Sequence, residues 1–280
     1  MNSFLQFIRF SHTIFALPFA LGAMIVAAQG RPSIKIVLLI ILAMVFARTT
    51  AMTFNRLVDW EIDKRNPRTA NRHLLVRRST AIAACAISAI LFVAAACAIN
   101  PLCGYLSPLA LAIVYFYSLT KRFTHAAQFF LGLALAVSPV GAWLAVTGKF
   151  ALPPLVLALG VFLWVAGFDI IYAIQDIEVD QVEGLKSMAV LMGIPTSLRL
   201  AQMLHIGMFL CLIFFGFLAH LGTPYAIALI CIFCALIWEH RIARRADLAS
   251  IQQAFFMSNA IVGLLFVIGI AVDRLLSGGI

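Results

Sequence analysis

Most of the acidic residues of this chain lie in two short segments that are far apart in the sequence. The chain has 280 residues, of which 11 are acidic, and eight of these lie in the two segments. They are Asp59, Glu61 and Asp63 in the first segment, and Asp169, Asp176, Glu178, Asp180 and Glu183 in the second. A surface that merely solvates its charges scatters them, so this concentration indicates a functional site.

The spacing within the segments indicates metal binding. Asn55, Asp59 and Asp63 recur every fourth residue, as do Asp176 and Asp180, and residues i and i+4 share one face of a helix. Carboxylates at this spacing destabilise a helix unless a cation neutralises them. Magnesium prefers one or two carboxylates together with phosphate oxygens of a substrate. Either segment alone would fit helix-end charges solvated by water, but the two together favour a divalent-metal site.

Arg48 is the second conspicuous residue, because it lies inside an apolar run. A charge within a membrane helix costs at least about 2.5–3.5 kcal/mol on the insertion scale and usually has a function. Arg48 precedes Asn55 by seven residues, which places it on the same helix face and about 10 Å deeper. The pattern predicts an anion site beneath the metal site; an Arg that snorkels or binds backbone carbonyls is the alternative. Arg56 is nearer the interface, where anchoring explains it.

These residues must be positioned by membrane helices. The chain is 64% hydrophobic and 11% charged, whereas soluble domains are about 25% charged. Apolar runs long enough to cross a bilayer occupy residues 12–29, 34–58, 80–99, 101–118, 126–147, 153–175, 198–219, 223–239 and 252–272. The first run lacks a small-x-small cleavage pattern and is therefore interpreted as a retained helix. We expect an all-α membrane protein that forms one domain over residues 1–280.

The basic residues predict the orientation of this domain. With nine crossings, fourteen of the 20 Lys and Arg residues fall on one side and four on the other. Basic residues favour the cytoplasmic side, so the N-terminus and both acidic segments should be cytoplasmic, in the cell membrane, with the C-terminus outside. The net charge of +9 is thus explained by membrane orientation and not by nucleic-acid binding.

Three motifs resemble those of the UbiA superfamily of intramembrane prenyltransferases. The segment from Asn55 to Asp63 is similar to its NxxxDxxxD motif, and the segment from Asp169 to Asp180 is similar to its DxxYAxxDxxxD motif. Tyr117 to Lys121 resembles the family's short YxxxK element between the fourth and fifth helices. The resemblance covers nearly the whole chain, because the motifs also fall in the expected gaps between nine crossings.

This resemblance implies a bundle of nine transmembrane helices around a central cavity, with Mg²⁺ held between the acidic segments and bound to the diphosphate of a polyprenyl diphosphate. The implied metal-site residues are Asn55, Asp59, Asp63, Asp169, Asp176 and Asp180. The implied catalytic residues are Asp59, Asp63, Asp176, Asp180 and Lys121. The implied substrate-binding residues are Arg48, Asn55, Tyr117, Lys121, Arg122 and Tyr172.

The resemblance also bears on the acceptor. In family members that use 4-hydroxybenzoate, an Arg seven residues before the motif Asn meets the acceptor carboxylate, and Arg48 occupies that position. The expected reaction is therefore prenyl transfer to 4-hydroxybenzoate in quinone biosynthesis. The same chemistry on 1,4-dihydroxy-6-naphthoate, in the futalosine route to menaquinone, stays open because that acceptor also carries a carboxylate.

Two other classes of membrane protein are alternatives. A secondary transporter would place its ionisable groups near the midplane, on broken helices, whereas these acids lie at one interface. A CDP-alcohol phosphotransferase would need a single dense DGxxAR…GxxxDxxxD block, which the chain lacks. Prenyl chain length and oligomeric state are left open by the sequence.

Overall fold

The computed structural model describes residues 3–8, 16–65 and 69–277, and within these ranges the chain is helical and has no β-strand. The short helices are α1 (Ser3–Phe7), α4 (Trp60–Arg65), α9 (Ile177–Val182) and α12 (Leu248–Gln253). The longer helices are α2 (Leu17–Ala27), α3 (Ile34–Val58), α5 (Arg78–Ile99), α6 (Pro101–Thr120), α7 (Ala127–Thr147), α8 (Leu152–Ala173), α10 (Met188–Leu218), α11 (Thr223–Ala243) and α13 (Asn259–Ser277). Tight 3₁₀ turns form η2 (Ala70–Leu74) and η3 (Ile174–Asp176), and a π-helical turn forms η4 (Ala254–Ser258).

The membrane-spanning helices agree with the apolar runs of the sequence. Eight helical stretches of the described chain are long and apolar enough to cross a membrane, and α2 is a shorter apolar helix of 11 residues. The predicted run 34–58 coincides with α3, and the first run begins at residue 12, outside the described residues. The prediction of an all-α membrane bundle is confirmed.

Two boundaries differ from the apolar pattern. α10 begins at Met188 instead of residue 198, and its first turns are set off by a kink where Gly193 has φ 71° and Pro195 follows. A hydropathy pattern cannot show that helix continues on both sides of such a kink. The last predicted run, 252–272, is divided among α12, η4 and α13.

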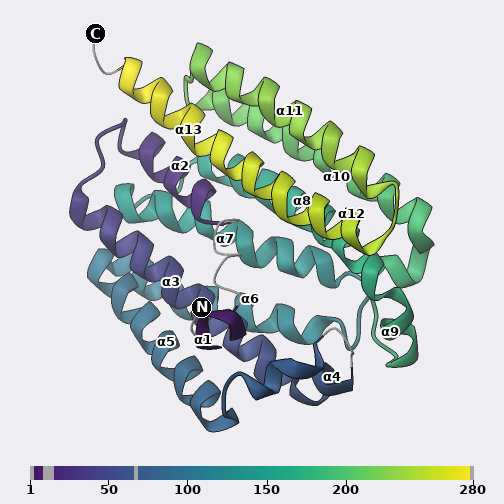
Figure 1. The fold of residues 1–280 in the computed structure, drawn as a ribbon. Helices are drawn as coiled ribbons and strands as arrows, with labels where there is room; N and C mark the ends of the chain where they lie inside the picture. The colour runs from purple at the N-terminus through teal and green to yellow at the C-terminus, as the bar shows by residue number, and fades with distance from the viewer. Residues whose placement is uncertain (1–2, 9–15, 66–68, 278–280) are drawn as a thin grey trace.

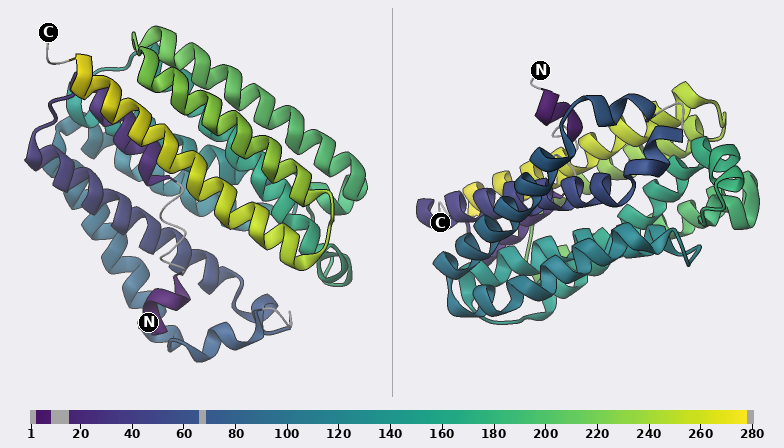
Figure 2. Two further views of the ribbon diagram at one scale, coloured as in Figure 1. Left: turned by 45° about the horizontal axis from the view of Figure 1, so that its top comes forward. Right: turned by 90° about the horizontal axis from the view of Figure 1, so that it is seen from below.

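The long helices lie side by side in a bundle (Figures 1 and 2). The N-terminal helices α3 and α5 form one side, and α10, α11 and α13 form the other. Successive spanning helices run in opposite directions, so α3, α6 and α8 all end at the same end of the bundle. The short helices α4 and α9 lie at this end, next to the two acidic segments (Figure 1).

Small residues allow close packing between the spanning helices. A Cβ atom built on Gly132 of α7 would lie 2.5 Å from the carbonyl oxygen of Phe162 on α8. In a bilayer, where lipid tails are as apolar as side chains, helix association depends on such close contacts. Aromatic rings fill the wider gaps: Phe19 lies 4.8 Å from Trp164 and 4.7 Å from Phe266 between ring centroids.

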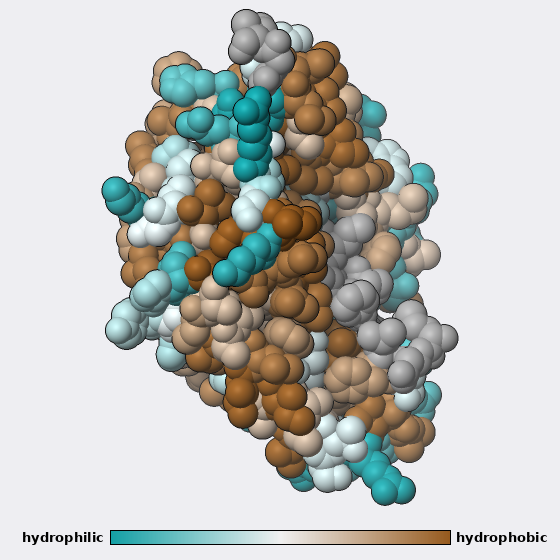
Figure 3. All heavy atoms as spheres, turned by 90° about the vertical axis from the view of Figure 1, so that its left-hand side faces the viewer, coloured by the Kyte–Doolittle hydropathy of each residue, from teal (hydrophilic) through white to brown (hydrophobic). Residues whose placement is uncertain are grey.

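The outer surface of the bundle is apolar. Leu38, Ile90, Leu210 and Ile230, on four different helices, are all exposed. Hydrophobic side chains cover most of the face shown in Figure 3. A surface of this kind marks contact with lipid or with another protein, and the spanning length of eight described helices favours lipid.

Candidate active site

Backbone and side-chain contacts join the helix ends that carry the motifs. The guanidinium of Arg122, just after α6, donates to the carbonyl oxygen of Val58 at the end of α3, at 2.7 Å. The amide of Lys186, after α9, donates to the carbonyl oxygen of Lys121 at 2.9 Å. The three predicted motif regions therefore meet at one end of the bundle.

Asp59 is the most buried acid of the first segment. α3 ends there, because the backbone of Asp59 leaves helical geometry (φ −90°, ψ 12°) while its N–H still donates to the carbonyl of Asn55. Its carboxylate lies 2.6 Å from Nζ of Lys121 and 3.4 Å from Nη2 of Arg122. Asp59 is only 2% exposed, so these two cations satisfy a charge that water does not reach.

Asp63 contacts a different pair of cations. Its carboxylate lies 3.3 Å from Nη1 of the buried Arg56 and 3.0 Å from Nη1 of Arg72. Although Asp63 lies only one helical turn after Asp59, it has different partners. The sequence interpretation missed both arginines: Arg56 was assigned to anchoring and Arg72 to the cluster that sets orientation. Their proximity in sequence to Asp63 was the only available signal.

The second segment forms a compact turn at the end of α8. Asp169 lies in the last turns of α8, Asp176 in η3 and Asp180 in α9. Asp169 interacts electrostatically with Asp176 and Asp180, and also with Lys121. Lys121 therefore lies between the two acidic segments: it is paired with Asp59 and acts on Asp169 as well.

An exposed ion pair joins the outer parts of the segments. Nη1 of Arg65, at the end of α4, lies 3.3 Å from a carboxylate oxygen of Glu183, just after α9. The side chain of Arg65 is 68% exposed, so this pair adds little stability. It shows, however, that the two segments lie close together at one end of the bundle.

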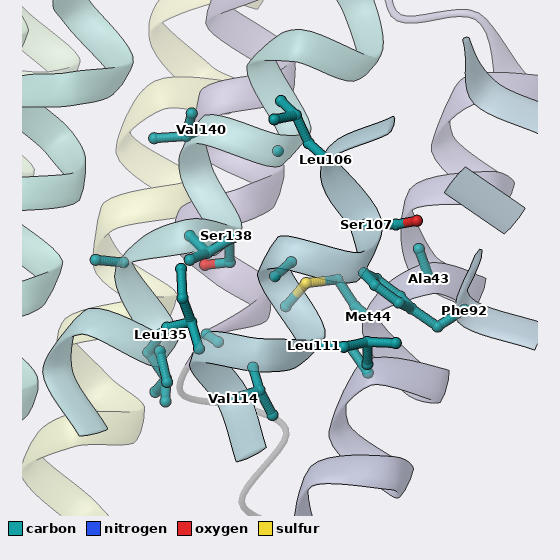
Figure 4. A pocket seen from close by; sticks show the side chains of 18 of the residues that line it. Ala43, Met44, Phe92, Leu106, Ser107, Leu111, Val114, Leu135, Ser138 and Val140 are labelled. Carbon is teal, nitrogen blue, oxygen red and sulfur yellow. The ribbon is translucent and has the colours of Figure 1, made fainter. Parts of the chain in front are cut away.

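A cavity of about 460 Å³ lies within the bundle between α3, α6 and α7 (Figure 4). Its walls are almost wholly apolar and include Met44, Leu111 and Leu135. Arg48 and Tyr117 are among its lining residues. The central cavity that the sequence resemblance implied is therefore present.

Tyr117 connects the cavity to the charged end. It lines the cavity and interacts electrostatically with Asp169, Arg48, Asp59 and Arg56. Arg48 is half-buried in the cavity wall on α3. Among the described lining residues, Arg48 is thus the charged one, and Ser107, Tyr117 and Ser138 are polar.

The remaining predicted residues lie around this centre. Asn55 is half-buried on the last turn of α3. Tyr172, near the end of α8, packs its ring against Phe255 of η4, with centroids 4.3 Å apart. Phe255 was not predicted, and the π-helical turn that presents it has no sequence pattern of its own.

The donor chemistry of the site fits magnesium. Carboxylate and amide oxygens are the hard ligands that Mg²⁺ takes. Among the described residues, no three His, Cys, Asp or Glu side chains are grouped closely enough to enclose a metal ion. Magnesium commonly keeps only one or two carboxylates and completes its shell with substrate phosphate oxygens. The residues present therefore suit an ion that is held jointly with a diphosphate.

The fold and the site together define a class: a multi-pass helical membrane protein with a centre of carboxylates and cations at one end of its bundle and an apolar cavity within it. The profile of the UbiA prenyltransferase family matches residues 16–260. The chain belongs to this family and is a membrane prenyltransferase. This membership decides against a secondary transporter and against a CDP-alcohol phosphotransferase.

Curated relatives are similar along nearly their whole length. The 4-hydroxybenzoate octaprenyltransferase of Pseudomonas entomophila is 31% identical over 259 residues, covering 90% of this chain and 86% of the relative. The corresponding protein of Vibrio atlanticus is 30% identical over 257 residues, covering 89% of this chain and 88% of the relative.

Solved structures share the fold. The apo structure of a UbiA homologue from Aeropyrum pernix K1 superposes with a TM-score of 0.84 at 30% identity, covering 94% of this chain and 98% of that chain. A UbiA homologue from Archaeoglobus fulgidus, bound to GPP and Mg²⁺, has a TM-score of 0.74 at 21% identity, with coverage of 97% and 99%. At that identity, the second likeness concerns the fold alone.

Proposed function

We propose that this prenyltransferase uses magnesium to transfer a polyprenyl group from polyprenyl diphosphate to the ring of a carboxylated aromatic acid, with 4-hydroxybenzoate as its acceptor. The observation that carries the proposal is that the charged centre and the apolar cavity occur in the same bundle. A centre of carboxylates and cations lies at one end of the bundle, and an apolar cavity within the bundle has Arg48 and Tyr117 in its wall, Tyr117 interacting electrostatically with Asp59 and Asp169. The names of the curated relatives agree with this acceptor.

The charged end suits the diphosphate. Lys121 and Arg122 already lie at a buried carboxylate, and they can turn to diphosphate oxygens when metal replaces them at Asp59. Arg72 and Arg56 likewise lie at the carboxylate of Asp63, and they too can turn to diphosphate oxygens when metal binds there. Bound Mg²⁺ would act as a Lewis acid on the departing diphosphate, held by Asn55 and the aspartates of the two segments. The four cations stabilise the negative charge that the leaving group gains as the allylic C–O bond breaks.

The apolar cavity suits the prenyl chain. Its walls exclude water, which would otherwise capture the allylic carbon in place of the aromatic ring. Tyr117 lines the cavity and interacts electrostatically with Asp169 and Asp59, so the reacting carbon is expected beside it.

Arg48 suits the acceptor. A guanidinium binds a planar carboxylate through two parallel hydrogen bonds and so fixes the plane of the aromatic ring. The ring carbon next to the hydroxyl would then face the allylic carbon and, after attack, lose its proton. Arg48 is equally suited to 1,4-dihydroxy-6-naphthoate, which stays the second candidate acceptor for this reason.

The orientation of the protein belongs to the same proposal. The acidic end also carries the basic residues of α4, η2 and the connection after α6, which favours the cytoplasmic face of the cell membrane for this end. A cytoplasmic site gives direct access to a charged diphosphate and to a soluble aromatic acid.

Purified protein tests the proposal directly. Radiolabelled polyprenyl diphosphates of several lengths would be incubated with 4-hydroxybenzoate, the dihydroxynaphthoate or a phenol without a carboxylate. We expect labelled prenyl acid only with the carboxylated acceptors, loss of product with EDTA and its return with Mg²⁺. Equal transfer to the phenol would refute the acceptor assignment, and full activity in EDTA would refute the metal.

A further inference from the structure

A second group of buried titratable side chains lies away from the site described above. Glu239 of α11 is fully buried, and His205 of α10 is 2% exposed. His240, next to Glu239 on α11, is half-buried. None of the three belongs to the family-like motifs, and they lie where α10 contacts both α8 and α11.

His205 is in contact with both neighbouring helices. Its Nε2 atom lies 3.2 Å from the carbonyl oxygen of Trp164 on α8. Its Nδ1 atom lies 3.0 Å from Nε2 of His240 and 3.7 Å from Oε2 of Glu239. Neither carboxylate oxygen of Glu239 has a hydrogen-bond partner.

The donors and acceptors in these contacts determine how many protons the cluster must hold to be neutral. A carbonyl oxygen only accepts, so Nε2 of His205 carries a proton. If His205 is neutral, its Nδ1 can only accept, and an ionised Glu239 would remain a buried charge without a partner, which is very costly. The group is neutral only if one additional proton resides on Glu239 or on Nδ1 of His205. Arg244 interacts electrostatically with His240, so a positive charge is less favourable there.

The same imidazole also supports the second acidic segment. A Cβ atom on Gly167 of α8 would lie 2.5 Å from the ring of His205, which means that the ring lies directly on the α8 backbone. Gly167 precedes Asp169 by two residues, and residues two apart point to nearly opposite sides of a helix. His205 therefore packs against the back of the turn that presents Asp169.

We propose that His205, Glu239 and His240 share one proton as a neutral cluster that fixes α8 against α10 and α11, and that His205 is thereby a positioning residue for Asp169. The proton sharing stands independently of the reaction, whereas the positioning role rests on the proposed function.

The sharing of a proton is tested by asking whether a second substitution restores the stability that the first one removes. His205→Gln keeps a donor for the Trp164 carbonyl but cannot hold the additional proton, so Glu239 is left without a proton-sharing partner. We expect its melting temperature in detergent to fall by about 10 °C, because the proton can no longer reside on Nδ1 opposite the Glu239 carboxylate and the buried ion pair of that state is lost. Glu239→Gln alone should stay close to the parent protein, and H205Q/E239Q should recover most of the loss. His220→Gln, at an exposed histidine at the other end of the bundle, is the control.

The outcomes separate the interpretations without any substrate. A double variant as unstable as H205Q, or E239Q as unstable as H205Q, would overturn proton sharing, because packing alone would then explain the cluster.

The positioning part has a kinetic measurement. H205Q should raise the Mg²⁺ concentration for half-maximal activity about five-fold, a coupling of ordinary size, with an unchanged KM for the aromatic acid. H205Q/E239Q should restore the Mg²⁺ dependence. Unaltered Mg²⁺ dependence in H205Q would remove the positioning role, even if the melting temperatures follow the rescue pattern.

Discussion

Replacing Gly132 with Ala tests whether the close contact of α7 with α8 holds the site in place. The added Cβ would lie 2.5 Å from the backbone oxygen of Phe162 and 3.2 Å from a carbon of its ring. A backbone atom cannot rotate away, so α7 and α8 must separate by nearly an ångström to reach ordinary contact. Gly141, on the same helix, provides the matched control, because a Cβ there meets nothing within 4 Å.

The magnitude follows from comparing the two variants. Both gain the same helix propensity from Gly to Ala, about 1 kcal/mol, so this contribution cancels in the difference. The remaining difference is the cost of overpacking at Gly132, roughly 1–3 kcal/mol. At about 2–4 °C per kcal/mol for a chain of a few hundred residues, G132A should melt roughly 2–12 °C below G141A.

The assay is thermal unfolding of the two purified variants in the same detergent, followed by prenyl transfer well below the melting transition. We expect G132A to lose activity as well, because α8 carries Asp169 and α7 lines the cavity. Equal melting temperatures for G132A and G141A would refute the reasoning, since they would show that the helices do not approach as closely as described.

Three further predictions concern single side chains. Asp59→Asn and Asp176→Asn should fold but lose nearly all transfer activity, measured at saturating Mg²⁺; normal turnover in either would contradict the metal assignment. Arg48→Ala should raise the KM for the aromatic acid about 10- to 100-fold through the loss of a charge-assisted contact, with little change for the prenyl diphosphate, and equal effects on both would remove Arg48 from the acceptor site. Hydrogen bonds from the Ser250 side chain and amide lower the pKa of Asp247, which caps α12, so its contribution to stability is complete at neutral pH and is lost as the pH falls through that lowered pKa. The melting temperature of Asp247→Asn should therefore depend less on acid pH than that of the parent protein, and an identical pH profile would contradict the cap.

Sequence and structure agree best for features that depend on residues close together in the chain, such as the bounds of a membrane-spanning helix. The helix from Ile34 to Val58 could be bounded from the sequence because a run of apolar residues must either cross the bilayer or be buried. The break at Asp59 could not, because an i, i+4 pattern looks the same whether or not the helix continues through it. The helical turns before the kink at Gly193 were missed because a hydropathy pattern does not show that helix continues on both sides of Gly193 and Pro195.

What the sequence alone determined is the class of molecule and the chemical inventory of its site. Composition requires a membrane bundle, and the spacing of the carboxylates indicates a cation between two acidic segments. These features depend on residues close together in the chain.

Only the tertiary structure decided which charges meet. Lys121 pairs with Asp59 across 62 residues of sequence, and Arg72 of η2 pairs with Asp63 of α4. His205 and Glu239, which as separate residues gave no functional signal, become one buried cluster when α10 packs against α11. The physical reason is that the energies of ion pairs and hydrogen bonds between helices depend on the distance between those helices. Side-chain packing fixes that distance to within a few tenths of an ångström, and no local sequence pattern encodes it.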